Sequence, residues 1–239
     1  MPGDTGLQRK IEIYGDGIGA VQYVEHMGSD LTIVNSARVS FGKQKMTMDK
    51  RDEKLITYLM EHKHTSTLEH NIVTFRFIVP LYVRSQHHRH RTWSYNEISR
   101  RYTDVDIRFY EPNAFRTQHK SNRQASNAEE LIDPDLFLAG TRRVAASEAF
   151  RGHNKISLEL FNSLIEAGVC REQARGVLPQ NMYTEYYGTV NLNNLLKFVE
   201  LRTHKGAQWE IQKVAEACLD IAQDLWPVTI KAYREARSK

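Results

Sequence analysis

Two segments rich in β-branched and aromatic residues, 71–79 and 182–190, constrain the fold most strongly. The first reads NIVTFRFIV and alternates in part between apolar and polar residues, as a strand does. The second, MYTEYYGTV, is rich in tyrosine and also predicts a strand. Because Pro80 suits the first turn of a helix, we expect the first strand to lead directly into a helix over 80–90. Shorter strands are expected at 10–15 and 106–112.

Helical patterns cover more of the chain than strand patterns do. Segment 49–62 places Leu55, Ile56 and Leu59 on one face, with acidic residues early and basic residues late, which predicts a helix. Asn191 is a suitable N-cap for a helix over 191–204. Further helices are expected at 29–40, 138–167, 171–177 and 207–225, with a last one after Pro227, whereas 116–130 is polar and predicts a mobile loop. The chain, 1–239, is therefore predicted to be a single α+β domain with helices in the majority.

The composition is that of a globular protein, with 41% hydrophobic and 26% charged residues. No apolar run is long enough to span a bilayer, and the N-terminal residues lack the apolar core of a secretory signal, so we expect a cytoplasmic protein without a membrane partner. The two cysteines, Cys170 and Cys218, have no metal-ligand spacing and are expected to be reduced. Cys218 lies on an apolar helical face and is predicted to be a core residue.

Three short patterns suggest chemistry that their surroundings do not support. GDGIGA, at 15–20, fits a dinucleotide-binding motif, but the segment that follows offers Asn35 where an acidic residue is expected, so a plain glycine turn is favoured. The histidines between 62 and 90 lie partly among arginines, whose positive field opposes a divalent cation, so no metal site is expected. Ser99 could be a nucleophile, but no G-x-S-x-G pattern surrounds it, so a ligand contact is favoured.

The formal net charge of +4 is unevenly spread along the chain. Between Arg84 and Arg101, five arginines and three histidines accompany a single acidic residue, Glu97. Such a cluster can be a solvated basic face, a nucleic-acid surface or a site for a small phosphorylated ligand. Arginine forks bind phosphate oxygens in pairs, so several converging arginines suit a nucleotide phosphate.

The residues after Arg91 can complete such a site if the chain turns back over the preceding helix. Ser99 and Arg101 would then join Gln86 and Arg89 around one ligand. Two more arginines stand in otherwise apolar or aromatic segments, where a purely surface role is harder to assign: Arg175 and Arg202.

The stretch RHRTWSYNEIS, 89–99, resembles the R-H-R-x7-S signature of the flavin-dependent thymidylate synthases. The resemblance extends to GSDLTIVNSARVSF at 28–41, HTSTLEH at 64–70 and LRTHKGAQWEIQ at 201–212, and also includes the AR and VLP residues of 174–179. It covers most of 28–215 and is weak from about 113 to 157.

The resemblance implies a fold, an assembly and a reaction. The fold is α+β with a mixed or antiparallel sheet, in a homotetramer whose active sites are assembled between chains. The reaction converts dUMP to dTMP with a methylene group from 5,10-methylenetetrahydrofolate and a hydride from reduced FAD, which NADPH regenerates. It needs no cysteine adduct, in agreement with the lack of a recognisable cysteine nucleophile.

Carried over position by position, the resemblance assigns two overlapping sets of residues. The dUMP set is Gln86, Arg89, Glu97, Ile98, Ser99, Arg100, Arg101, Arg175 and Arg202. The FAD set is Ser66, Arg89, His90, Arg91, Glu97, Asn191, Asn193 and Lys197. Arg202 is the expected catalytic residue, because a cation at the uracil ring stabilises developing negative charge and lowers the pKa of N3. Asn193 and Lys197 depart from the arginine and asparagine of some members.

A single-stranded nucleic-acid-binding protein is the competing hypothesis. Trp93, Tyr95 and Tyr102 could serve as stacking platforms between the basic residues. No RRM, KH or zinc-knuckle pattern accompanies them, and a net charge of +4 is modest for that role, so a nucleic-acid polymer is not the expected partner.

Overall fold

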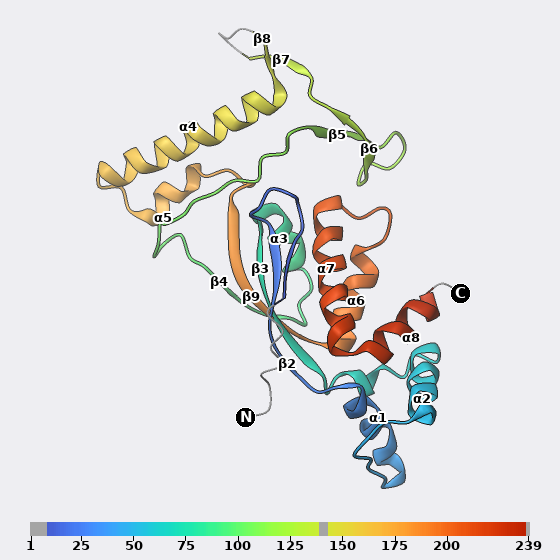
Figure 1. The fold of residues 1–239 in the computed structure, drawn as a ribbon. Coiled ribbons are helices and arrows are strands. Elements are labelled where there is room, and N and C mark those ends of the chain that lie inside the picture. Colours follow the sequence, from blue (N-terminus) through green and yellow to red (C-terminus); the bar gives the residue numbers. More distant parts are fainter. Residues whose placement is uncertain (1–8, 139–142, 238–239) are drawn as a thin grey trace.

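The computed structural model describes residues 9–138 and 143–237. Its centre is a five-stranded sheet with the spatial order β1-β2-β3-β9-β4, in which every pairing is antiparallel (Figure 1). The strands are β1 (Lys10–Glu12), β2 (Ala20–Met27), β3 (Ile72–Pro80), β4 (Ser94–Glu97) and β9 (Tyr183–Asn191). The two strands predicted at 71–79 and 182–190 are confirmed as β3 and β9, which lie side by side with Phe75 opposite Gly188. The predicted α+β class with a helical majority is also confirmed.

The glycine-rich segment 15–20 is a turn between β1 and β2. Gly15 and Gly17 adopt positive φ angles of 71° and 72°, which glycine reaches without a steric penalty. The Asp16 carboxylate accepts hydrogen bonds from the backbone N–H groups of Ile18 at 2.9 Å and Gly19 at 3.0 Å. A strand, and not a helix, follows the turn, so the predicted plain glycine turn is confirmed. A dinucleotide-binding motif would need a helix N-terminus at this place to bind the pyrophosphate, and β2 stands there instead.

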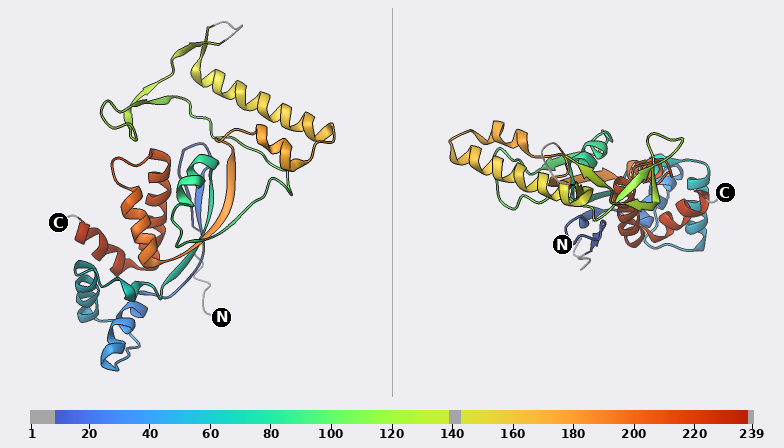
Figure 2. Two further views of the ribbon diagram at one scale, coloured as in Figure 1. Left: turned by 180° about the vertical axis from the view of Figure 1, so that it is seen from behind. Right: turned by 90° about the horizontal axis from the view of Figure 1, so that it is seen from above.

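Helices cover one face of the sheet and continue below it (Figures 1 and 2). Phe75 and Phe77 of β3 share one fully buried core with Phe198 and Cys218, so the prediction that Cys218 is a core residue is confirmed. Asn191 caps its helix by accepting a hydrogen bond from the Asn194 backbone N–H at 2.9 Å, as predicted. The helices of this body are α1 (Asp30–Arg38), α2 (Lys50–Glu61), α3 (Leu81–His87), α6 (Leu192–Arg202), α7 (Trp209–Leu225) and α8 (Pro227–Arg237), with short 3₁₀ turns η1 (Val39–Phe41) and η2 (Thr65–Leu68).

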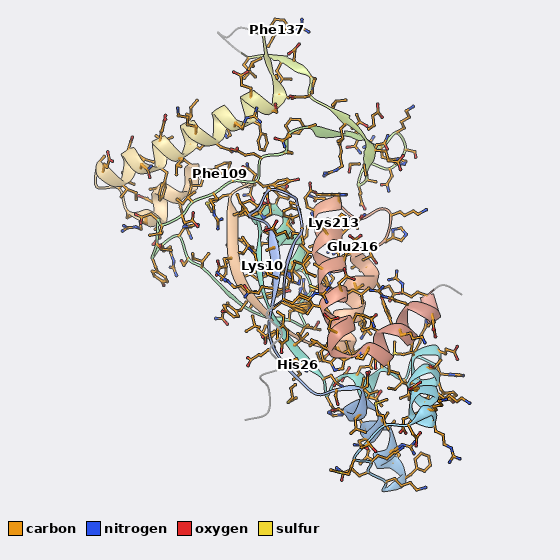
Figure 3. All side chains as sticks on the ribbon, in the orientation of Figure 1. Lys10, His26, Phe109, Phe137, Lys213 and Glu216 are labelled. Atoms are coloured by element: carbon orange, nitrogen blue, oxygen red, sulfur yellow. The ribbon has the colours of Figure 1, made fainter. Side chains whose placement is uncertain are left out.

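Residues 113–138 and 143–177, here called the arm, extend beyond one end of the sheet (Figures 1 and 2). A small core around Phe161, with Ala174, Leu178 and Met182, holds the arm's helices against the body. Phe137 lies near the tip of the arm, far from Lys213 on the body (Figure 3). The arm contains β5 (Phe115–Gln118), β6 (Ser126–Ile132), β7 (Asp135–Phe137), β8 (Arg143–Ala145), α4 (Ala146–Glu166), α5 (Arg171–Ala174) and η3 (Arg175–Val177).

Several predicted elements are wrong, mostly in the arm. The expected mobile loop at 116–130 contains the β5–β6 hairpin, whose strands are too polar to show an apolar alternation. The long helix begins at Ala146 and not near residue 138, because 135–137 and 143–145 pair as strands. Segment 106–112 forms only one bridge, between Phe109 and Met182, and no full strand.

The remaining differences lie in the body. Strands β2 and β4 were not predicted, and helix 80–90 ends at His87. Within the described residues, no helix is long and apolar enough to cross a membrane.

Candidate active site

The basic stretch 88–93 forms a compact turn that joins the end of α3 to the edge strand β4. The His90 backbone N–H donates to the His87 carbonyl at 2.9 Å. The Tyr95 hydroxyl hydrogen-bonds the carbonyls of both His87, at 2.9 Å, and His90, at 3.2 Å. After the turn the chain joins the sheet, because β4 pairs with β9, and the Arg89 and Arg91 side chains are exposed on the turn.

Arg202, the last residue of α6, meets this turn. Its Nε donates to His90 Nε2 at 3.0 Å, and its Nη2 donates to the Gln86 carbonyl oxygen at 3.4 Å. Burial and the neighbouring Arg202 charge lower the pKa of His90 to about 4, so this imidazole is neutral and can accept. Within the described residues no carboxylate pairs with Arg202, so its guanidinium is held in place by neutral groups alone.

A chain of polar contacts leads away from the Gln86 side chain. Gln86 Nε2 donates to Gln208 Oε1, and Gln208 Nε2 donates to Glu210 Oε2 at 2.9 Å. The Glu210 carboxylate is only 3% exposed, and its other oxygen accepts from Arg116 of β5 at 2.5 Å. The contacts thus run from α3 through the start of α7 to the arm.

Glu97, at the end of β4, has defined partners. Its Oε1 lies 3.1 Å from Arg84 Nε and accepts from the Thr184 hydroxyl at 2.7 Å. The next residue, Ile98, is exposed, while its backbone N–H donates to the Glu185 carbonyl at 2.9 Å.

The residues that follow Ile98 differ in what their side chains can reach. Ser99 is half-buried, and its hydroxyl oxygen accepts from the Arg101 backbone N–H at 3.3 Å. Arg101 is exposed and lies over the exposed ring of Tyr102. Arg100, in contrast, is buried and donates to the Val105 carbonyl at 2.7 Å, so its guanidinium faces the protein. Arg175 is exposed at the end of α5, in the arm.

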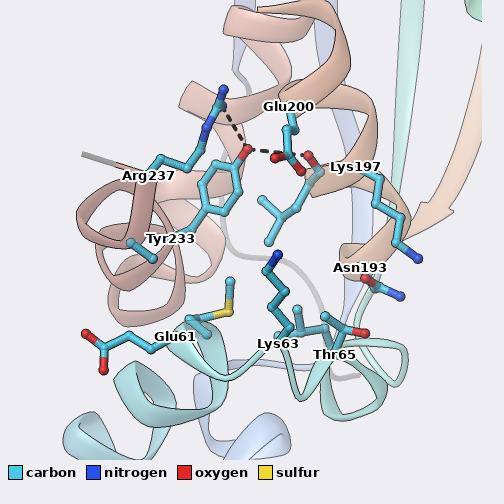
Figure 4. Close-up of a pocket in the computed structure, with 12 residues that line it drawn as sticks. Glu61, Lys63, Thr65, Asn193, Lys197, Glu200, Tyr233 and Arg237 are labelled. Carbon is cyan, nitrogen blue, oxygen red and sulfur yellow. Dashed lines mark hydrogen bonds between the residues drawn. The ribbon is translucent and has the colours of Figure 1, made fainter. Parts of the chain in front are cut away.

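A pocket of about 800 Å³ lies on the other side of α6 (Figure 4). Asn193 and Lys197, both assigned to FAD by the resemblance, line it, and Ser66 follows Thr65, a third lining residue. Asn193 is 3% exposed, and its amide donates to Glu69 Oε1 at 2.8 Å. The lining residues come from α2, the α2–η2 connection, η2, α6 and α8: Met60, Glu61, Lys63, Thr65, Leu68, Asn193, Leu196, Lys197, Glu200, Tyr233, Ala236 and Arg237.

Basic residues slightly outnumber acidic residues around this pocket. The Lys63 ammonium points into its middle, while Arg237 donates to the Tyr233 hydroxyl at 3.0 Å on the opposite wall (Figure 4). With Lys197 the pocket has three basic residues, against the two acidic residues Glu61 and Glu200. The pocket therefore suits a ligand with both an apolar ring and phosphate groups.

The structure brings only some of the predicted residues together, in two groups, and within the described residues no hydrogen bond or ion pair joins Ser99, Arg101 or Arg175 to either group. Gln86, His90 and Arg202 make direct contacts at the C-terminal end of α6. Asn193 and Lys197, one turn apart on another face of α6, line the pocket together with Leu196 and Glu200.

Sequence reasoning missed Lys63, Tyr233 and Arg237 of the pocket, and Gln208 and Glu210 beside Gln86. Only the segment LRTHKGAQWEIQ, singled out by the resemblance, pointed toward the last two. Nothing in the local sequence marked Lys63, Tyr233 or Arg237.

The aromatic residues of the motif do not form an open stacking surface. Trp93 is only 5% exposed and belongs to the core with Phe75 and Phe198. Tyr95 is half-buried, and Tyr102 alone of the three is open, at 77% exposed. Nucleic-acid stacking needs accessible ring faces, so two of the three platforms of the competing hypothesis are absent.

Comparison with known proteins places the chain among relatives of known family. The sequence profile of the family described as thymidylate synthase complementing protein matches residues 22–228. The chain is 42% identical to the flavin-dependent thymidylate synthase of Thermus thermophilus over 217 residues, which is 91% of this chain and 76% of that protein. It is 41% identical to the flavin-dependent thymidylate synthase of Kosmotoga olearia over 215 residues, 90% of each chain.

A solved structure shares the fold. The UMP/dUMP methylase PolB from Streptomyces cacaoi, bound with 5-Br dUMP, has a TM-score of 0.77 and 31% sequence identity, covering 94% of this chain and 97% of that one. The family match over residues 22–228 and these relatives show that the chain is an enzyme of the thymidylate synthase complementing protein family. Within it, the chain belongs to the flavin-dependent thymidylate synthases, as its signature predicted.

Proposed function

We propose that this enzyme methylates dUMP to dTMP, with 5,10-methylenetetrahydrofolate as carbon donor, NADPH as reductant and FAD as cofactor. The names of the relatives from Thermus and Kosmotoga, and the dUMP analogue bound to PolB, support the reaction class and the nucleotide. The proposed dUMP-binding residues are Gln86, Arg89, Glu97, Ile98, Ser99, Arg100, Arg101, Arg175 and Arg202.

The environment of Arg202 is the observation that most strongly supports this proposal. Its guanidinium is half-buried and is held by the neutral His90 and by a backbone carbonyl. Burial lowers its pKa from the usual value, but guanidinium remains charged at neutral pH. A cation that no described carboxylate neutralises can stabilise negative charge as it develops on a uracil ring. We therefore assign to Arg202 the activation of the ring.

A covalent protein nucleophile is not part of this proposal. Cys218 is fully buried, and burial raises the pKa of its thiol well above the usual value. Cys170 is exposed but lies in the arm, at the start of α5. The Ser99 hydroxyl already accepts from the Arg101 backbone and, in this proposal, contacts the ligand without attacking it.

The pocket beside α6 fits the proposed FAD. Its volume of about 800 Å³ lies within the usual range for cofactor sites, and its basic residues suit a pyrophosphate. Asn193 and Lys197 would hold the cofactor there, with Ser66 and Asn191 close to lining residues in the sequence. The other proposed FAD residues, Arg89, His90, Arg91 and Glu97, lie outside this pocket and would contact the cofactor from a partner chain. When bound, the flavin supplies the hydride that completes the methyl group.

We further propose that the chain acts as a single domain in a homotetramer and is cytoplasmic. The two groups of site residues face different sides of α6, so a complete site would combine surfaces of more than one chain.

The deciding experiment measures dTMP formation from dUMP, methylenetetrahydrofolate and NADPH, anaerobically, with and without added FAD. Flavin-dependent dTMP is the expected product. Failure to form dTMP, combined with failure to bind dUMP, would overturn the proposal. Binding to single-stranded nucleic acid that collapses with salt and ignores dUMP would then favour the competing hypothesis.

A further inference from the structure

The buried carboxylate of Glu210 is connected to the proposed nucleotide site through a single intermediate side chain. Gln208 stands between it and Gln86, with one hydrogen bond to each. Gln86 in turn holds Arg202 through its backbone carbonyl. The orientation of the Gln86 side chain is therefore set by Gln208 and Glu210, which lie outside the proposed nucleotide site.

The direction of each hydrogen bond follows from the chemistry of the carboxylate. Carboxylate oxygens of Glu210 accept and do not donate, and one of them already accepts from Arg116. Gln208 must therefore turn its NH₂ group toward Glu210, which leaves its oxygen facing Gln86. Gln86 must then donate with one N–H of its own NH₂ group, which turns its side-chain oxygen away from Gln208 and toward another partner.

We propose that Glu210 is a positioning residue that fixes the Gln86 amide so that its oxygen, and not its NH₂ group, faces the nucleotide. This inference rests on the proposed function and deepens it. It assigns to Gln86 the recognition of a hydrogen-bond donor on the ligand, an N–H of the base or an O–H of the sugar. A ligand that offers only an acceptor at that place would leave two acceptors facing each other, which is costly in a desolvated site.

The arm contacts the Glu210 end of this chain of hydrogen bonds. Arg116 lies in β5, its guanidinium is 5.0 Å from the centre of the Trp209 ring, and its Nε donates to Ser126 Oγ of β6 at 2.9 Å. The Glu210 hydrogen bond and charge outweigh burial and raise the pKa of Arg116. The hairpin of the arm thus holds the carboxylate that orients the site.

A thermodynamic cycle tests the direction of these bonds. The affinity for dUMP is measured by calorimetry for the wild type, Glu210→Gln, Gln86→Glu and the double variant. An amide at 210 no longer dictates how Gln208 lies, so Glu210→Gln alone should weaken dUMP binding by about threefold to tenfold. Gln86→Glu alone removes the donor that Gln208 requires and should weaken binding more strongly.

The double variant separates positioning from simple structural support. With an amide at 210, Gln208 can reverse, donate to Glu at 86 and accept from Gln at 210. Glu210→Gln should therefore strengthen dUMP binding in the Gln86→Glu background, although it weakens binding in the wild type. A purely structural role of Glu210 would weaken binding in both backgrounds.

Asp220→Asn, a neutralised acid farther along α7, is the matched control and should bind dUMP as the wild type does, because its carboxylate contacts the exposed Arg234 at 3.2 Å. The inference alone is overturned if the wild type binds dUMP and Glu210→Gln has the same sign of effect in both backgrounds. Absence of dUMP binding by the wild type would instead overturn the proposed function and the inference together.

Discussion

Replacing Arg202 by alanine should reduce the rate of dTMP formation by about 10³-fold. A unit positive charge about 4 Å from a developing negative charge contributes about 4 kcal/mol at an effective dielectric constant of about 20, which suits a half-buried pair. A barrier increase of about 4 kcal/mol corresponds to about 10³ in rate. The fold should lose little, because the lost bonds, to His90 and to the Gln86 carbonyl, are partly open to water and contribute about 1 kcal/mol each.

The assay is single-turnover dTMP formation with saturating dUMP, together with a thermal unfolding scan. Arg202→Lys should recover part of the rate, because it restores the charge but not the geometry of the two donors. Arg234→Ala is the control, since this exposed arginine of α8 pairs with Asp220 on the surface. Near wild-type turnover by Arg202→Ala, in a protein of normal thermal stability, would refute the role assigned to this charge.

Three further predictions concern other residues of the described chain. The pKa of His90 is lowered from its ordinary value of 6.5 to about 4 in the folded protein, so between these two pH values the unfolded state binds more protons than the folded state. The free energy of unfolding, measured in urea, should therefore decrease as the pH drops from 6.5 to 4. The decrease should be smaller for His90→Gln, which has no imidazole to protonate. Burial raises the pKa of Asp52, but hydrogen bonds from Lys45, Arg38 and the backbone outweigh it and lower it to about 2. Asp52→Asn should therefore lower the free energy of unfolding in urea by about 2 kcal/mol at neutral pH, and this difference from the wild type should shrink as the pH falls from 3.8 to 2. An unchanged unfolding midpoint at neutral pH would contradict this prediction. Ser99→Ala should raise the dissociation constant for dUMP severalfold in calorimetry and leave measurable turnover, whereas intact binding with no chemistry would restore the nucleophile hypothesis.

The sequence by itself determined the elements whose patterns are local and strong. Helix α2 and strands β3 and β9 follow from period and residue type, and Asn191 begins α6 as an N-cap should. The same local information produced the family signature at 89–99, because that motif is contiguous in the chain. It failed for β4, which has only four residues, and for the polar β5–β6 hairpin, whose strands have little apolar surface to reveal them.

Only the tertiary structure decided which side chains meet. His90 and Arg202 are 112 residues apart, and Gln86 and Gln208 are 122 apart, yet each pair is hydrogen-bonded. No local period encodes such contacts, because they depend on how α6 and α7 pack against the sheet and on the rule that buried polar groups must find partners. The sequence therefore identified the chemistry of the arginines, while packing determined that the motif turn meets the C-terminal end of α6 and that the pocket lies on another face of the same helix.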